Sequence, residues 1–327
     1  MHLVSKGLEH IPSGLWTKNH FLDLDDVLKD IVFYRGVSRI LLKKCFKAQK
    51  PDVNCPKSNY SYYAKLARSD CETILTNCSY DNKEFPCCQY FLPIETDIGP
   101  CFIINSVQTK KQQPYPMVKN MRNKQGVLRL YVNVTSMMYT LGDDEVPTIT
   151  TSLSSTLKLQ YGRKYRRVLS VRDIDNDPFI TETTAKQRAC RFHHENEGGL
   201  YPQYSYSACT VLCRKRAQLK LCQCNDHFML NTTEEERCNI TGMNCLNSMS
   251  KYLTALKPAW SQRPGLTCDC LPSCDEREIT VINDEARNPG NDLKPALVEI
   301  ILGFLPTERF KRNVVRSRLD LVGKHLH

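Results

Sequence analysis

Seventeen cysteines in a chain of 327 residues restrict what this sequence can fold into more than any other feature. Thiols are kept reduced in the cytosol, so a cysteine content this high indicates folding in an oxidising compartment. The number is odd, and at least one cysteine is therefore free or has its partner elsewhere. The length is enough for one or two domains that each bury a hydrophobic core.

Charge and hydropathy narrow the class of protein further. The formal net charge is +10, but the basic residues lie in short scattered clusters such as Arg163–Arg167, which does not favour a nucleic-acid partner. The longest apolar run, Ala296–Leu305, contains Glu299 and is shorter than the about 20 apolar residues of a membrane-spanning helix. Met1–Leu15 lacks the unbroken apolar segment of a signal peptide. We therefore expect the sequence to be a piece, or a shortened product, of a larger protein.

Hydrophobic periodicity predicts an α+β fold. Helical spacing predicts helices at Leu22–Leu42 with Asp23 or Asp25 as N-cap, at Cys71–Cys78 with Asp70 as N-cap, from Ser207 as N-cap through Arg216, and at Cys245–Leu256. Alternation and composition predict strands at Val127–Thr135, within residues 147–170, and at Thr267–Leu271, Glu278–Ile282 and Leu297–Phe304. Strands thus precede and follow a helical insertion, and the polar segment Gln108–Gln125 is expected to be a loop.

The last ten cysteines could form a ladder of disulfides, although ten cysteines allow on the order of a thousand pairings. Cys209 and Cys213 lie about 6 Å apart along one face of a helix, and Cys268 and Cys270 lie about 6.6 Å apart on one face of a strand. The matched spacings could therefore carry two stacked bridges, Cys209–Cys270 and Cys213–Cys268. Around them, Cys190–Cys274 would close the outside, while Cys222–Cys245 and Cys224–Cys238 would tie the connector between the helices.

Other interpretations of these residues have less support. A zinc module would need Cys-x-x-Cys pairs, which are absent, and ten thiolates exceed the four ligands of a structural site. No nucleophile elbow, P-loop or zinc-protease helix occurs, so we expect no catalysis, cofactor or metal. His193-His194-Glu195 could titrate near neutral pH, although an exposed turn is the simpler interpretation. Five Asn-x-Ser/Thr sequons are candidate glycosylation sites, at Asn59, Asn77, Asn133, Asn231 and Asn239.

Four stretches carry a resemblance to a known family: Thr96–Asn105, with its Gly-x-Cys-x-x-x-Asn pattern; Gln187–Phe192; Tyr204–Cys224; and Cys268–Cys274. Together they resemble the extracellular domain of the degenerin/epithelial sodium channel family, in particular its insect pickpocket branch. The family pairs its ten thumb cysteines in the nested order given above. The resemblance covers about residues 70–323, and Val298–Val322 is similar to the last palm strand and the lead-in to the second membrane helix.

The resemblance implies a disulfide-rich, hand-like ectodomain with a β-sheet palm, a helical finger and a two-helix thumb. The implied parts are an N-terminal and finger region (1–70), a finger cysteine cluster (71–100), palm and β-ball strands (101–189), a disulfide-laced thumb (190–274), a knuckle and return palm strand (275–323) and a polar tail (324–327). The implied function is extracellular gating of a trimeric amiloride-sensitive sodium channel in the plasma membrane, by ligand, proton or force. Its partners would be sodium ions, other subunits and an unknown extracellular ligand. The alternative is a secreted cysteine-rich binding protein without channel activity.

The sequence also departs from the family pattern. Both membrane helices and the cysteine motif after the first helix are missing, and the chain turns polar at Gly323–His327. In the family the counterpart of Cys101 bridges to that motif, so we expect Cys101 to be a free thiol or to scramble with Cys45 or Cys55. The aromatic residue that couples thumb to pore is missing from Thr184–Ala189.

Overall fold

A computed structural model describes residues 21–47, 50–51, 55–110, 126–258, 260–288, 295–303 and 309–313. Its helices are α2 (Phe21–Val32), α3 (Ile40–Cys45), α4 (Tyr60–Ala67), α5 (Cys71–Ile74), α6 (Cys87–Tyr90), the 3₁₀ helix η2 (Pro178–Glu182), α7 (Ala185–Arg188), α8 (Tyr206–Cys222), α9 (Ile240–Ser248) and α10 (Ser250–Leu253). Within these ranges no helix has the length and apolar character that crossing a bilayer requires.

The strands form one large sheet and three small pairs. They are β1 (Phe46–Lys47), β2 (Lys50–Pro51), β3 (Leu75–Tyr80), β4 (Lys83–Phe85), β5 (Leu92–Ile94), β6 (Cys101–Ile103), β7 (Val127–Val132), β8 (Ser136–Tyr139), β9 (Thr156–Leu159), β10 (Lys164–Asn176), β11 (Arg277–Arg287), β12 (Ala296–Leu302) and β13 (Arg309–Arg312). The large sheet has the order β11-β10-β12-β7-β3-β4, and β13 pairs with the far part of β10. The small sheets are β1-β2, β5-β6 and β8-β9.

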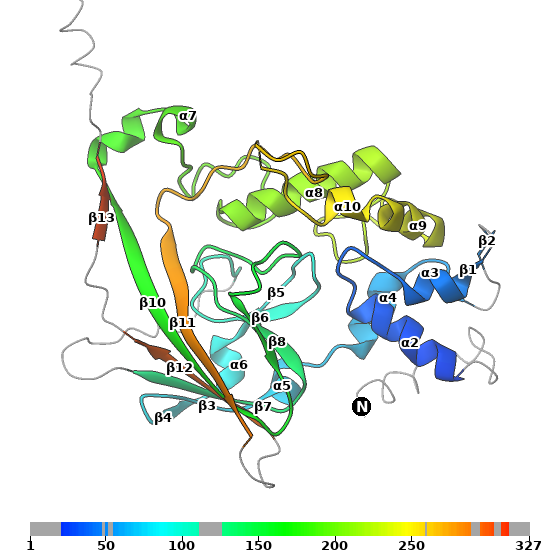
Figure 1. Cartoon of the computed structure of the whole chain (residues 1–327), viewed down its shortest axis with the longest axis horizontal. Helices are drawn as coiled ribbons and strands as arrows, with labels where there is room; N and C mark the ends of the chain where they lie inside the picture. The colour runs from blue at the N-terminus through cyan, green and yellow to red at the C-terminus, as the bar shows by residue number, and fades with distance from the viewer. Residues whose placement is uncertain are drawn as a thin grey trace, which may run out of the picture.

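A long insertion separates the neighbouring strands β10 and β11. These two strands pair antiparallel along most of their length, from Lys164 opposite Arg287 to Asp173 opposite Arg277. Residues 177–276 leave the sheet at the end of β10 and return to it at the start of β11, and they contain every helix from η2 to α10. Figure 1 shows this insertion running from the end of the sheet across to α8, α9 and α10.

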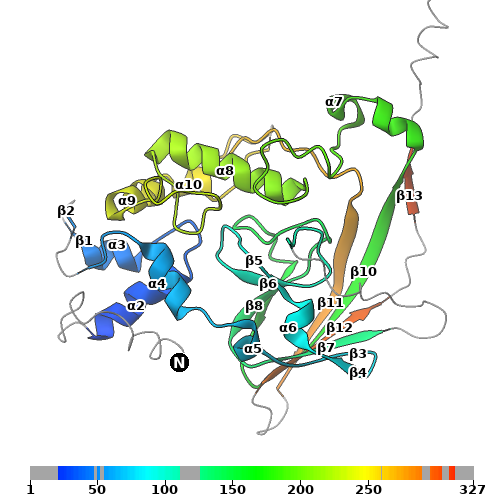
Figure 2. The same cartoon turned by 180° about the vertical axis from the view of Figure 1, so that it is seen from behind.

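Three hydrophobic cores hold the parts together. One lies between the helices α2–α4 and the segment of residues 224–266. A second lies on the sheet, with buried side chains from β3, β7, β10 and β12. A smaller third core joins Ile94 and Val146 to Val211 of α8 and Met229. Figures 1 and 2, from opposite sides, both place β5, β6 and β8 between the sheet and the helices.

The fold is α+β and disulfide-rich, as the sequence predicts, and the described residues contain eight disulfides. The predicted strands are β7, β9–β10, β11 and β12, although β7 ends at Val132 and β11 continues to Arg287. The residue Phe304 and the segments 111–125 and 314–327 lie outside the described residues, and so do residues 1–20.

Several element predictions are wrong. The expected helix Leu22–Leu42 is interrupted after Val32, where Gly36 takes a positive φ of 75°, and Asp23 and Asp25 lie inside α2. The expected helix at Cys71–Cys78 stops at Ile74, because the following residues pair with β7. Asp70 precedes α5 but its side chain makes no capping hydrogen bond.

The predictions for the insertion need three further corrections. Ser205, and not Ser207, caps α8, and its hydroxyl accepts from the backbone N–H of Ala208. The helix expected from Cys245 begins at Ile240, where Asn239 caps it, and breaks at Met249 before the short α10. Residues Thr267–Leu271 form no strand, because no neighbouring strand lies beside them and disulfides to α8 hold them instead.

Candidate functional site: the disulfide unit and its junctions

The residues from Cys190 to Cys274, here called the disulfide unit, are closed where they join the sheet. Cys190 and Cys274 are bonded to each other, with their Cα atoms 5.0 Å apart. Beside this bridge, the Arg191 carbonyl accepts from the Cys274 N–H at 2.8 Å, and the Arg191 N–H donates to the Pro272 carbonyl. Cys274 lies three residues before β11 begins. The two chains that leave and re-enter the sheet are therefore fixed to each other at the neck of the unit.

A ladder of two disulfides stiffens the unit along α8. Cys209 is bonded to Cys270 and Cys213 to Cys268, with Cα–Cα distances of 5.8 Å and 5.9 Å. Both distances lie in the usual range for disulfides, and the one-turn spacing of the two helical cysteines lets both bridges form on one face of α8. At the far end of α8, Cys222 is bonded to Cys245 of α9, and Cys224 to Cys238. These five pairs match the nested order that the sequence analysis expects, and they leave none of the ten thiols to bind zinc.

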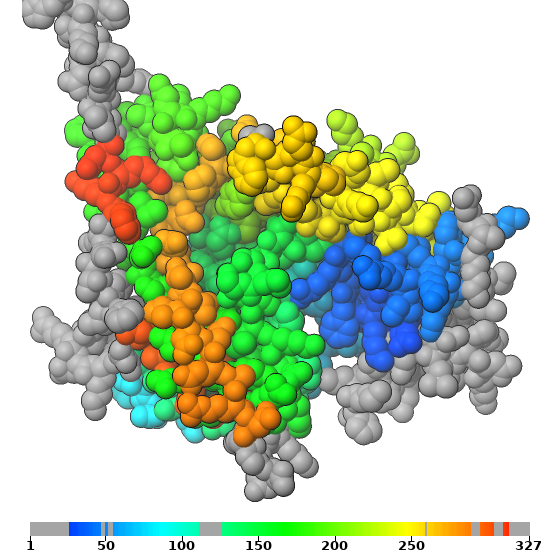
Figure 3. Space-filling view, viewed as in Figure 1, coloured from blue at the N-terminus to red at the C-terminus, as the bar shows by residue number. Residues whose placement is uncertain are grey.

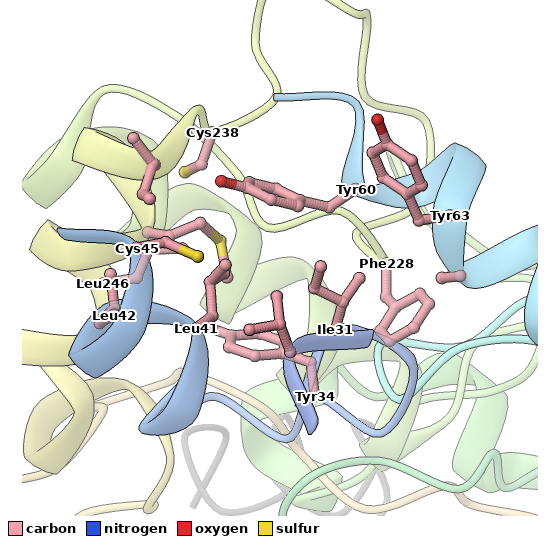
Figure 4. Packing of buried hydrophobic residues seen from close by; sticks show 14 of the residues in the cluster. Ile31, Tyr34, Leu41, Leu42, Cys45, Tyr60, Tyr63, Phe228, Cys238 and Leu246 are labelled. Carbon is pink, nitrogen blue, oxygen red and sulfur yellow. The ribbon is translucent and has the colours of Figure 1, made fainter. Parts of the chain in front are cut away.

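The helices α2, α3 and α4 with the described residues between them, here called the helical lobe, share a core with the far end of the disulfide unit. Figure 4 shows Ile31, Tyr34 and Leu41 of the lobe facing Phe228 and Leu246 of the unit. Hydrogen bonds cross the same interface, from the N–H of Ile240 to the Lys57 carbonyl and between His227 Nε2 and the Ile31 carbonyl, both at 2.8 Å. Figure 3 shows the lobe in surface contact with α9 and α10.

Beside this interface, buried charges join the disulfide unit to the turn before β6. Arg214 of α8 and Asp97, each 1% exposed, form an ion pair, and Arg214 Nε also donates to the Leu253 carbonyl at 2.9 Å. Burial raises the pKa of Asp97 to about 6, although Arg214 lowers it. Burial also lowers the pKa of His227. Arg214 therefore joins α8 to α10 and to the turn before β6. Separating Arg214 from Asp97 would leave a buried charge without a partner.

Arg68 fastens the same turn to the lobe. Its guanidinium donates to the carbonyls of Val32, Ile98 and Pro100 at 2.7–2.9 Å and lies over the ring of Phe228. Gly99 has a φ of 99°, and a Cβ at this position would lie 2.2 Å from Arg68 Nη2. Only glycine therefore fits under this guanidinium.

At the neck, the sheet contacts the bridge directly. The side chain of Asn176, the last residue of β10, donates to the Cys274 carbonyl at 2.9 Å. Arg312 of β13 lies with Nη1 2.9 Å from Cys190 Sγ and 3.3 Å from the Cys274 carbonyl. Three strands, β10, β11 and β13, thus meet the neck of the disulfide unit.

A scan against protein-family models matches residues 16–325 to the amiloride-sensitive sodium channel family. The chain belongs to this family. Pickpocket protein 19 of Drosophila melanogaster is 23% identical over 235 residues, which are 62% of this chain and 45% of the relative. Sodium channel protein Nach of Drosophila virilis is 25% identical over 149 residues, 42% of this chain and 37% of the relative. The chain thus spans less than half the length of the curated relatives that it matches.

Membership of this channel family agrees with the resemblance carried by Thr96–Asn105 and the thumb cysteines. The amiloride-sensitive sodium channel family is one of ion channels and not of enzymes.

Three more disulfides, whose pairing the sequence left open, lie outside the disulfide unit: Cys45–Cys55, Cys71–Cys88 and Cys78–Cys87. Their small sequence separations of 10, 17 and 9 residues were the available signal.

Cys101 is the free cysteine, and all seventeen cysteines lie in the described residues. The expectation of a free thiol agrees with the structure, and the alternative of scrambling with Cys45 or Cys55 is wrong, because these two are bonded to each other. Thr96 Oγ1 lies 3.7 Å from Cys101 Sγ, and burial raises the pKa of this thiol.

Glycosylation of the five sequon asparagines remains a prediction, and so does the role of the segment that lacks the coupling aromatic. All five sequon asparagines, Asn59, Asn77, Asn133, Asn231 and Asn239, are exposed, so each is sterically open to a glycan. The segment Thr184–Ala189, which lacks the expected aromatic, forms the capped helix α7. Sequence reasoning missed Phe179, an aromatic side chain of η2 that is 61% exposed and lies just beyond the end of β10.

Proposed function

We propose that this chain is the extracellular gating part of an amiloride-sensitive sodium channel in the plasma membrane. The parts of the family hand map onto it as follows: the sheet is the palm, the helical lobe is the finger, and the disulfide unit is the thumb. In the whole protein, sodium ions would be the permeant species and further subunits, in a trimer, the partners.

One observation carries the mechanism, the covalent closure of the disulfide unit at its neck. Because Cys190–Cys274 joins the two chains that continue into β10 and β11, a displacement of α8 moves both strands together. The ladder makes α8 and residues 268–270 one body, so little of the displacement is absorbed by bending within the unit. A ligand, proton or force that shifts the helical lobe would act on this body through the shared core.

In this proposal, β13 and Phe179 transmit the displacement of the disulfide unit toward the pore. β13 pairs with β10 from Asp173 to Asn176, and Arg312 contacts the neck bridge. By family resemblance the chain after β13 leads toward the second membrane helix. Phe179 projects from the end of β10 and takes, in this proposal, the coupling role of the missing aromatic.

The test is a chimera in which residues 16–325 are placed between the two membrane segments of a family channel. In oocytes we expect a sodium current blocked by amiloride, recorded at rest and during pH and flow steps. Phe179→Ala should reduce the evoked current at unchanged surface expression. Phe33→Ala, which removes a similarly exposed aromatic from the lobe, is the matched control and should leave the evoked current unchanged.

A chimera that reaches the cell surface but carries no amiloride-blocked current under any of these conditions would contradict the proposal. Secretion of the unaltered chain into the medium, together with that result, would favour the binding-protein alternative.

A further inference from the structure

The loop that contacts the N-terminal end of α8, opposite the helical lobe, contains a buried carboxylate that no part of the proposed mechanism uses. Asp144 follows β8 in the loop of residues 142–146 and is 0% exposed. Among the described residues no hydrogen-bond donor reaches either of its carboxylate oxygens. An ionised carboxylate without a partner in such a place is strongly unfavourable. Its one close counter-charge in the described chain is His193, whose Nε2 lies 3.5 Å from Asp144 Oδ2.

The loop of residues 142–146 holds three parts of the molecule together. Ser207, in the first turn of α8, donates its N–H to Glu145 Oε2 at 3.1 Å, and the N–H of Val146 donates to the Ser207 hydroxyl at 2.9 Å. Asp143 forms an ion pair with Arg277, the first residue of β11. His193 belongs to the disulfide unit, three residues after the neck cysteine Cys190.

We propose that His193 and Asp144 form a pH-sensitive latch that holds the loop of residues 142–146 between α8 and β11 when His193 is protonated and weakens when it is neutral. Protonated His193 neutralises the buried carboxylate. Neutral His193 leaves the negative charge of Asp144 beside Asp143 and Glu145, so the loop then separates more readily from Ser207.

The charges around the latch act in the same direction. His193 faces Asp144, Asp143 and Asp275, and the Asp144 carboxylate raises the pKa of His193 against the effect of burial. Burial, with Asp144 and Glu276 adding to it, raises the pKa of Glu145 to about 7, although its hydrogen bonds with Ser207 lower it. Burial likewise raises the pKa of Asp143, although Arg277 lowers it. Burial also raises the pKa of Glu276, although Arg312 lowers it.

The sign of the pH effect follows from these shifts. A group that binds its proton more tightly in the folded state stabilises that state at low pH, and the effect is lost as pH rises through its folded pKa. For Glu145 the loss falls between about 4.5 and about 7. For His193 it begins near its unfolded pKa of about 6.5 and ends above that value. The windows of Glu145 and His193 therefore adjoin, and a variant that removes only the His193 ring identifies its share of the pH dependence.

The test is amide hydrogen exchange at Val146 and Ser207 in the whole chain, between pH 6 and pH 8.5 and corrected for intrinsic exchange. We expect the opening of these amides to increase by up to roughly tenfold for each pH unit by which the folded pKa of His193 exceeds the unfolded one. His193→Gln should remove the share of this increase that belongs to His193 and leave a smaller increase between pH 6 and pH 8.5, and Asp144→Asn should do the same. His194→Gln is the control, because His194 is exposed and stacks only on Phe192 in the described residues, and it should behave as the wild type.

An NMR titration keeps the proposal testable if a variant does not fold. The ring protons of His193 in the wild type should report a pKa above 6.5. Opening that does not change between pH 6 and pH 8.5, a His193 pKa at or below 6.5, or an unchanged pH dependence in folded His193→Gln would each overturn the latch.

Discussion

At the scale of single residues, the structure contains a buried ion pair where the sequence shows only a family motif. Asp97 lies in Thr96–Asn105, which the sequence analysis used as a family marker, and its partner Arg214 is 117 residues away. No periodicity or spacing connects residues so far apart. The type of residue could be read from the sequence, but the pairing depends on how the turn before β6 meets α8.

Arg214→Met should destabilise the protein by about 3–5 kcal/mol at pH 8, because it leaves Asp97 as a buried charge without a partner. The loss should be smaller at pH 5, since Asp97, whose pKa is already about 6 in the presence of Arg214, would then be protonated. Denaturant unfolding at both pH values measures this. The double variant Asp97→Asn/Arg214→Met should recover part of the stability at pH 8, and equal losses at both pH values would argue against a charge effect.

Cys101 should react slowly with thiol reagents in the folded chain. The thiolate is the reactive form, and burial raises the pKa of this thiol, so less thiolate is present at neutral pH. Labelling at pH 7.5 should be slower than that of an exposed cysteine and should become complete, with one label per chain, after unfolding without reductant. Two or more labels would mean that the disulfides are not the eight found here.

At the scale of elements, the sequence predicted the disulfide-bonded helix better than the segments beside it. The spacing of Cys209 and Cys213 is a property of one helix, and it could be read directly. The opposite segment, Thr267–Leu271, has the cysteine spacing of a strand but no strand beside it, so its apolar alternation was misleading. Cys71–Cys78 was misread for a related reason, since its helical pattern is overridden at Leu75 by pairing with β7.

The two bridges of the ladder should contribute to stability in a non-additive way. They close chain segments of 61 and 55 residues, but with one bridge intact the other encloses a ring of only about eight residues. With both open, the neck bridge Cys190–Cys274 still limits the released ring to about 25 residues. Losing one bridge should then cost about 2.5 kcal/mol, and losing both should cost about 1 kcal/mol more than two single losses, because the second opening releases a much larger loop. Cys209→Ala/Cys270→Ala, Cys213→Ala/Cys268→Ala and the fourfold variant, compared by thermal and denaturant unfolding, measure the difference. Strictly additive losses would indicate that strain or packing, and not loop entropy, dominates.

At the scale of the whole molecule, the fold consists of two large cores joined by a small one. The sequence indicated an insertion between strands, but not that its far end shares a core with residues 27–64, because that contact joins segments more than 150 residues apart. The sheet core contains no residue of the disulfide unit. The third core contains residues of both the unit and the β-strand region, including Met229 and Ile94. A relay from lobe to sheet can therefore pass through the neck, through this third core and through the loop of residues 142–146, which contacts both α8 and β11.

Native-state hydrogen exchange should separate these cores. Leu246→Ala and Leu130→Ala each delete a buried side chain, from the lobe core and the sheet core respectively, and each should cost about 2–5 kcal/mol. Because cooperative units open separately, the first variant should increase exchange mainly in α2–α4 and α9, and the second mainly in β3, β7 and β12. Met229→Ala, at the third core, should increase exchange mainly in α8 and in β5 and β6, since Met229 is 1% exposed and shares this core with Val211 and Ile94. Uniform increases in all three variants would mean that the chain opens as a single unit, and the disulfide unit could then not act as a separate body between the lobe and the sheet.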